Sequence, residues 1–493
     1  MLNNERRLPL GLTHRGAWLT VVILAGLVRL IPVLFSTVAR GDGLTRTLYA
    51  WQFSQHPHWQ GLTGVWLPLH WYCFGSLLMI WNNPLGLAKV LGWLTGTGTV
   101  ALYFSLVRRI HGTQAALWGG VLMSLYWFHI WLTPTNFVDI YVLFLYVAAI
   151  YFSVRTQQSG QLKSRLVFAC CAGVCVGITI LLRHEAKLAA AAIAVWMLVV
   201  VNWRSAIAFC VVTGVPVLAQ FVEYRSQGKG LLGDFAKASE LQQAAAAFSG
   251  SGAVQGLLRW VKLTAGSPTL FVFIPGLMAM WWKRREAIRD PLALFFVLFT
   301  CFYLFLTITK GWSPQGRYLM LYFFGLFGYA GVVYSRLAAS GRHLALAALL
   351  VLYVGNQAGA WYIRNDKQVL GALPIQLDSR EQRAVNGFYD TLPRPTSEVF
   401  VDLTEAEWWS FRVTLAERNE WDQFDKHIFR AVEEQQLLIE RGFADFDPSR
   451  ATILLVRPQS KMYFAMQNYF PQLHLQMLKQ VGNVGIFRIT KQV

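Results

Sequence analysis

Long apolar stretches separated by short polar loops dominate the chain from residue 17 to residue 361. A helix needs about 20 apolar residues to cross the hydrocarbon core of a bilayer. Several stretches reach that length, so the pattern predicts a polytopic α-helical membrane protein. We predict about eleven spans, with the approximate ranges 17–38, 86–107, 113–131, 135–154, 166–182, 187–203, 205–222, 268–283, 291–309, 317–335 and 343–361.

Two further segments, between the first and second spans, are predicted to lie on the membrane surface. Residues 66–81 are apolar and rich in Trp, but the segment is short and contains Pro68 and His70. Aromatic side chains of this kind anchor a helix at the membrane interface. We therefore expect an interfacial helix here and a second one over residues 43–55, both in the first external loop.

The last part of the chain, residues 362–493, is polar and alternates strand-like and helix-like patterns. These patterns predict a small α/β domain that follows a membrane-embedded domain over residues 1–361. The strands are expected at 397–403, 451–458, 473–479 and 484–490, and the helices at 424–442 and 461–469.

The net charge of +18 does not indicate a nucleic-acid partner, because the basic residues of the apolar part lie mostly in short loops. With eleven spans and a surface helix at 66–81, every basic loop cluster falls on one side, which the positive-inside rule makes cytoplasmic. The N-terminus is then cytoplasmic and residues 362–493 are extracytoplasmic. The six cysteines all lie in apolar stretches, without the spacing of a disulfide framework or a metal site.

Acidic residues are scarce in the apolar part: 17 of the 26 Asp and Glu residues follow residue 362. Carboxylates at the ends of membrane segments are costly and usually functional. Glu240 lies in a long loop, 223–266, and such loops often act as active-site lids. Six of the nine early acids fall in the predicted external loops and indicate a reaction site there: Asp42, Asp139, Glu185, Glu223, Asp234 and Glu240.

Three polar residues in the first two external loops could act together. Asp42 stands between two glycines directly after the first span, where it could be a general base or a cation ligand. Asn136 and Asp139 are three residues apart at a predicted helix start, so they could share one face. With Asp42 they could bind an acceptor or a divalent cation. The alternative for all three is capping of the helices that follow.

Cations on the external side are expensive at membrane depth unless they meet an anion. Arg183 and Lys187 lie between the fifth and sixth spans, and Arg317 with Tyr318 begins the tenth. The planar fork of Arg suits a phosphate, so this group is predicted to bind one. The alternatives are pairing of Arg183 with Glu185, and extension of the Lys187 side chain to the interface. His70 is expected to make interfacial hydrogen bonds and is a candidate acceptor contact.

These residues resemble the motifs of the GT-C membrane glycosyltransferases, particularly the protein O-mannosyltransferase and aminoarabinose-transferase group. The shared marks are an Asp after the first span, a Pro-Leu-aromatic element, an Asp at the start of the fourth span, a cation after the fifth and an Arg-Tyr-Leu start of a late span. In this chain they are Asp42, Leu67-Pro68-Leu69-His70-Trp71-Tyr72, Asp139, Arg183 and Arg317-Tyr318-Leu319. Gly43 stands where many members have Glu, and Leu67 where a second Pro is usual.

The resemblance implies a polyprenyl-phosphate-linked sugar as donor and a protein, lipid or glycan as acceptor, on the extracytoplasmic face of what we expect to be a bacterial inner membrane. It implies that Asp42 is the catalytic carboxylate, with Asp139 as a second catalytic candidate, and that basic residues near Arg183 and Arg317 hold the lipid phosphate. No cofactor is predicted, with a divalent cation at Asp42 and Asp139 left open. The alternatives are a non-catalytic membrane assembly subunit and a transporter of a lipid-linked glycan. Transporters usually place acids in mid-membrane within broken helices or repeats, whereas the acids here lie at span ends.

Overall fold

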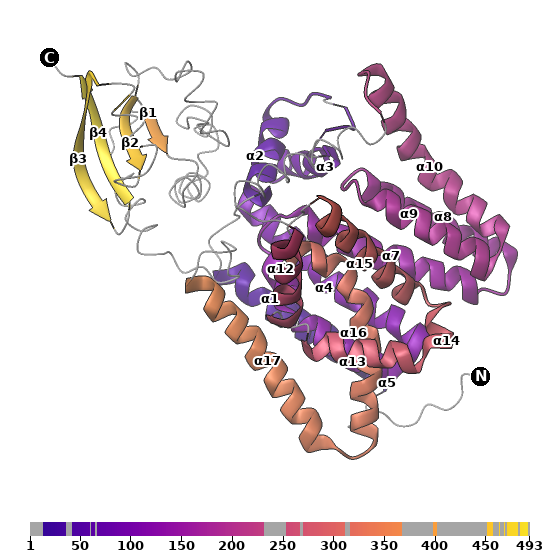
Figure 1. Ribbon diagram of the computed structural model, residues 1–493. Helices are drawn as coiled ribbons and strands as arrows, with labels where there is room; N and C mark the ends of the chain where they lie inside the picture. Colours follow the sequence, from indigo (N-terminus) through magenta and orange to yellow (C-terminus); the bar gives the residue numbers. More distant parts are fainter. Residues whose placement is uncertain are drawn as a thin grey trace.

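The computed structural model shows a helical bundle followed by a small β-sheet (Figure 1). This architecture confirms the predicted fold class of a helical membrane protein with a C-terminal unit that contains strands. The structure describes residues 13–35, 42–59, 61–64, 67–230, 253–266, 270–310 and 316–366, and beyond them chiefly the segments 398–401, 451–456, 471–481 and 484–491.

All eleven predicted spans are helical, but one of them is interrupted. Seven of the described helices are long and apolar enough on their own to cross a membrane, and three shorter apolar helices accompany them. The prediction of one continuous helix over 113–131 is wrong, because the helix ends at Ser124 and restarts at Trp127. The helices of the spans are α1 (His14–Phe35), α4 (Pro84–His111), α5 (Thr113–Ser124) with α6 (Trp127–Leu132), α7 (Val138–Gln158), α8 (Leu162–Ile180), α9 (Ala186–Trp196) with the π-helical turn Met197–Val201, α10 (Trp203–Ser226), α13 (Leu270–Trp282), α15 (Pro291–Lys310), α16 (Gly316–Ala339) and α17 (His343–Asp366).

The first loop contains the two helices that the sequence predicts, α2 (Asp42–Gln55) and α3 (Leu69–Leu78). They pack closely, since a Cβ atom at Gly75 would lie 2.6 Å from the backbone oxygen of Ala50. Trp71 and Phe74 fill the space beside this crossing. Two more helices, α12 (Ala253–Gly266) and α14 (Arg284–Ala287), flank α13 in sequence.

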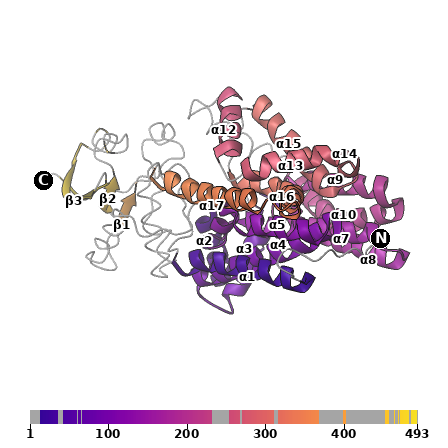
Figure 2. The same cartoon turned by 90° about the horizontal axis from the view of Figure 1, so that it is seen from below.

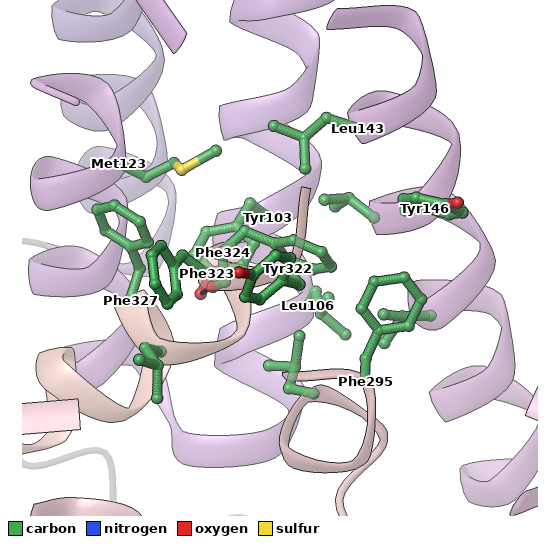
Figure 3. Close-up of a cluster of buried hydrophobic side chains, with 14 of the residues drawn as sticks. Tyr103, Leu106, Met123, Leu143, Tyr146, Phe295, Tyr322, Phe323, Phe324 and Phe327 are labelled. Atoms are coloured by element: carbon green, nitrogen blue, oxygen red, sulfur yellow. Dashed lines mark hydrogen bonds between the residues drawn. The ribbon is translucent and has the colours of Figure 1, made fainter. Parts of the chain in front are cut away.

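Helix α16 forms the centre of the bundle (Figure 2). Of the apolar stretch of α16 that could cross the membrane, 83% is buried inside the protein, against 28% of the corresponding stretch of α1. Glycines let α16 approach α5: a Cβ at Gly331 would lie 2.3 Å from the backbone oxygen of Ala115, and small residues commonly allow such crossings in membranes. Aromatic side chains fill the interior around it (Figure 3), including Tyr103, Tyr146, Phe295, Tyr322, Phe323, Phe324 and Phe327.

The four predicted strands are confirmed as β1 (Glu398–Val401), β2 (Ala451–Val456), β3 (Leu473–Val481) and β4 (Val484–Lys491). Their order in the sheet is β1-β2-β4-β3, with β1 and β2 parallel and the other pairs antiparallel. A parallel pair needs a long crossover connection. That connection contains the predicted helix 424–442, which lies outside the described residues, as does most of 461–469.

Candidate functional site

The start of α2 lies directly against the loop that precedes α7. A Cβ atom at Gly43 would lie 1.9 Å from the backbone oxygen of Thr135, so only glycine allows this approach. The contact places the backbone of Asp42, the first residue of α2, beside this loop. The Asp42 side chain lies outside the described residues.

Asn136 connects three of the surrounding helices. Its side chain donates to Thr47 Oγ1 of α2 at 2.7 Å, and its Oδ1 accepts from Tyr141 of α7 at 3.2 Å and lies 3.3 Å from His70 Nε2 of α3. Asn136 is 1% exposed and has φ 52°, in the left-handed region that Asn adopts more readily than most residues. This network fixes the position of the loop relative to α2 and α3.

The expectation that Asn136 and Asp139 share one helical face is wrong. Asn136 precedes α7 and has a left-handed backbone, so the two side chains contact different partners. Capping does not explain Asn136 either, because the N-cap of α7 is Phe137 and no side chain makes a capping hydrogen bond there.

His70 makes a buried hydrogen bond, in line with the role expected for it. Burial and the nearby Arg46 guanidinium lower the pKa of His70 to about 3, although its contact with Asn136 acts in the opposite direction. The ring is therefore neutral at pH 7. Because Asn136 Oδ1 is an acceptor, His70 donates to it through Nε2.

Arg183 pairs with two carboxylates, Asp139 of α7 and Glu185 of its own turn. Its Nε donates to Glu185 Oε1 at 3.1 Å, and the same oxygen accepts from Tyr303 of α15 at 3.2 Å. Burial alone would raise the pKa of Glu185, but the Arg183 guanidinium lowers it to about 2. Internal pairing with Glu185, which the sequence left open, is observed. Asp139 adds a second counter-charge from another helix.

Arg317 joins the same cluster from the start of α16. Its guanidinium carbon lies 4.9 Å from the ring centre of Phe137 and 5.0 Å from that of Tyr318. The Arg183 guanidinium lies 4.7 Å from the Tyr318 ring, so Tyr318 contacts both cations. Cations are attracted to aromatic faces at such distances. Arg183 and Arg317 thus contact the same aromatic ring.

A short piece of the first loop, residues 61–64, is tied to this region. Glu223 at the end of α10 accepts from the backbone N–H groups of Leu62 at 2.6 Å and Thr63 at 3.2 Å. His184 Nε2 lies 3.1 Å from the backbone oxygen of Gly64. The Lys187 ammonium lies 5.5 Å from the Tyr224 ring, in α10.

Several residues of this arrangement are not identified by the sequence analysis: Thr47, Phe137, Tyr141 and Tyr303. The two tyrosines lie near span ends, where aromatic residues are common, so their position alone gives no specific signal. Glu240 and Asp234 lie outside the described residues. In the described part of the chain, no group of three His, Cys, Asp or Glu side chains could hold a metal ion. The divalent cation that the sequence leaves open at Asp42 and Asp139 stays open, because the Asp42 carboxylate lies outside the described residues.

No protein-family model and no curated protein matches the chain. Its structure is similar to that of ArnT from Cupriavidus metallidurans in the apo state, with a TM-score of 0.60 and 13% identity over 95% of this chain and 97% of that chain. The same protein bound to undecaprenyl phosphate gives a TM-score of 0.59 at 12% identity, with the same coverage. The archaeal oligosaccharyltransferase AglB from Archaeoglobus fulgidus, in complex with an inhibitory peptide and a dolichol-phosphate, gives 0.55 at 13% identity over 96% of this chain and 74% of that chain.

Identities this low establish the fold alone. The similarity to ArnT extends over nearly the whole of both chains, and the similarity to AglB over nearly the whole of this one. The protein therefore has the fold of the GT-C glycosyltransferases, as its sequence motifs predict.

Proposed function

We propose that this protein is a membrane glycosyltransferase that moves a sugar from a polyprenyl-phosphate-linked donor to an acceptor on the extracytoplasmic face. One observation carries the proposal: within a GT-C fold, the start of α2, the loop before α7, the turn at Arg183 and the start of α16 meet at one place. ArnT has been captured with undecaprenyl phosphate and AglB with a dolichol-phosphate. A lipid phosphate is therefore a reasonable ligand for the cations here.

The two arginines would serve the phosphate differently. The hydrogen bonds of Arg183 to Asp139 and Glu185 use three of its five N–H groups, so it can still donate to a ligand. Its charge, however, is already balanced by those carboxylates. Arg317 stacks on Phe137 and Tyr318 and brings a second positive charge. We assign Arg317 as the principal phosphate ligand, with Arg183 and Lys187 as additional ones.

The proposed chemistry needs the phosphate charge neutralised and the acceptor deprotonated. Positive groups that stabilise the charge developing on the leaving phosphate favour cleavage of the sugar–phosphate bond. A carboxylate near the acceptor hydroxyl can remove its proton, and Asp42 is our candidate for this role. Asp139 is buried and bound to Arg183, so we propose that it contributes by holding that guanidinium in place.

The sidedness of the site is part of the proposal. The basic loop clusters favour a cytoplasmic N-terminus, an extracytoplasmic site and an extracytoplasmic domain over residues 362–493, in a bacterial inner membrane. We further propose that the transferred sugar is a hexose or a pentose, because the sequence motifs resemble those of the O-mannosyltransferase and aminoarabinose-transferase group.

The proposal can be tested with the purified chain in lipid nanodiscs. Mass spectrometry of the extracted lipids would identify a co-purified polyprenyl phosphate or its sugar-linked form. Incubation with polyprenyl-phosphate-linked hexoses and pentoses should then release the free polyprenyl phosphate when an acceptor extract is added. Binding of the lipid without any release, over all donors and extracts, would instead favour a non-catalytic subunit.

A further inference from the structure

The break between α5 and α6 lies inside the apolar bundle. In a continuous helix the N–H of Trp127 would bond to the backbone oxygen of Met123. Here α5 ends at Ser124, and the N–H of Trp127 points elsewhere. Backbone polar groups at membrane depth must be satisfied within the protein, so the break needs partners from other elements.

Side chains from α1 and α17 provide those partners. Arg29 of α1 donates to the backbone oxygens of Ser124 at 3.2 Å and Met123 at 3.4 Å. Tyr353 of α17 donates to the backbone oxygen of Leu122 at 2.8 Å. Gln357, one helical turn later, accepts from the N–H of Trp127 at 3.1 Å. Both sides of the break are thus held by two helices that are distant in sequence.

The same contacts set the position of α6. Arg29 is fully buried and also contacts Nδ1 of His129 in α6. Directly after α6, the backbone at Thr133 packs closely against α4. A Cβ atom at Gly92 of α4 would lie 1.8 Å from the backbone oxygen of Thr133. Helix α6 has only six residues, so a displacement at Trp127 is passed on to the loop that follows.

That loop is the one that carries the candidate site. Thr135 contacts Gly43 at the start of α2, Asn136 binds α2 and α3, and Phe137 stacks against Arg317. We propose that Arg29, Tyr353 and Gln357 are positioning residues that fix the loop at 133–137, and through it the relative positions of Asp42 and Arg317. The catalytic consequence rests on the proposed function, whereas the structural link between α17 and the loop does not.

Two single substitutions on α17 test this link with little change in volume. Tyr353→Phe removes the donor to Leu122, and Gln357→Leu removes the acceptor for Trp127. Gln357→Glu keeps an acceptor at the same place. Tyr103→Phe is the matched control, because Tyr103 of α4 is also fully buried and donates to a backbone oxygen, that of Phe324 in α16.

Hydrogen–deuterium exchange of the whole protein in nanodiscs gives a readout that needs no enzymatic activity. Exchange over residues 127–139 should accelerate about tenfold in Tyr353→Phe and Gln357→Leu, with α8 and α10 unchanged. Tyr103→Phe should leave 127–139 as in the wild type, and Gln357→Glu should restore most of the protection. Equal exchange over 127–139 in all variants would overturn the proposal, and so would a uniform acceleration over the whole protein.

Function is measured on the same variants with two probes. The turnover of a sugar donor should fall about tenfold in Tyr353→Phe and Gln357→Leu, because small displacements of reacting groups are costly to rate. The affinity for undecaprenyl phosphate should fall about fivefold, since Phe137 moves with the loop. Faster exchange with unchanged turnover and lipid affinity would refute the positioning role. If the wild type turns over no donor, the proposed function fails. The positioning role is then decided by the hydrogen–deuterium exchange rates and the lipid affinity.

Discussion

Arg183 bridges Asp139, 44 residues away in sequence, and Glu185 of its own turn. The cation that the sequence favours as a phosphate ligand thus already carries two counter-charges. All three side chains are largely buried, with exposed fractions of 11%, 1% and 14%. A buried guanidinium between two carboxylates is held in one orientation. The geometry therefore favours an organising role for Arg183, in keeping with our proposal that Arg317 is the principal phosphate ligand.

The first prediction concerns Asp139→Asn. Removing one partner of a buried ion pair typically costs about 3–5 kcal/mol because it leaves the other charge uncompensated. Arg183 keeps Glu185, so we expect a loss of about 3 kcal/mol, at the low end of that range, measured by denaturation of the purified protein. Glu286→Gln is the control, since the Glu286–Lys283 pair has a 70% exposed carboxylate and such pairs contribute about 0–1 kcal/mol. Similar losses in both variants would argue against a structural role for the Asp139 pair.

The second prediction concerns Arg317→Ala. A hydrogen bond to a charged group contributes about 1.5–3 kcal/mol, so the affinity for undecaprenyl phosphate should fall by roughly ten- to a hundredfold. Lys187→Ala should have a smaller effect. Arg336→Ala is a matched control at the other end of α16, because Arg336 also stacks on an aromatic ring, that of Trp282 at 5.2 Å. If Arg317→Ala and Arg336→Ala bind the lipid equally well, Arg317 is a packing residue.

The third prediction concerns Asp42→Asn, which keeps the size of the side chain and removes its basicity. Loss of a general base lowers turnover by about two to four orders of magnitude. We expect this loss with unchanged expression and thermal stability, and with nearly unchanged affinity for the lipid phosphate. Turnover close to that of the wild type would remove Asp42 from the catalytic role.

The sequence predicts the elements of the fold well because hydrophobic periodicity reports directly on membrane helices and strands. It fails at the α5–α6 break, where residues 125 and 126 are Leu and Tyr, with no Pro or Gly to mark an interruption. The backbone groups at the break bond to Arg29, Tyr353 and Gln357, which lie far away in sequence. Local patterns carry no information about such tertiary partners.

The candidate site is predicted in part for the same reason. Charged residues at span ends are rare enough to identify Arg183 and Arg317, and the structure brings these two together. The sequence predicts the contacts of the neighbouring polar residues less well. Sequence spacing suggests that Asn136 and Asp139 act together, but the left-handed backbone at Asn136 separates their contacts. A residue that adopts such a conformation because of its neighbours cannot be recognised from helical periodicity.

The fourth prediction concerns the pH dependence of stability. In the unfolded chain His70 takes up a proton near pH 6.5, whereas in the folded protein its pKa is about 3. The stability linked to neutral His70 is therefore complete above pH 6.5 and is lost as the pH falls toward 3. His70→Gln can still donate to Asn136 but does not titrate. Between pH 6.5 and pH 5 the stability of the wild type should fall relative to His70→Gln, by up to about 1.4 kcal/mol per pH unit.

Thermal denaturation of both proteins across this pH range gives the comparison. Glu185 also has a lowered pKa, but it is common to both proteins and titrates below this window. Parallel stability curves for the wild type and His70→Gln would show that His70 takes up its proton as easily in the folded protein as in the unfolded chain.

The fifth prediction concerns the sidedness of the membrane part, on which the location of the reaction depends. In a cysteine-free background, Gln476→Cys in β3 should react with an impermeant thiol reagent added to intact cells, because Gln476 is exposed and residues 362–493 are predicted to be extracytoplasmic. Gly160→Cys should react only after the membrane is permeabilised. Gly160 is exposed in the basic loop between α7 and α8, and a Cβ atom there meets nothing within 4 Å. The reverse labelling pattern would place Arg183 and Arg317 on the cytoplasmic side, where the positive-inside rule alone would account for both cations. The phosphate site would then lose its electrostatic argument.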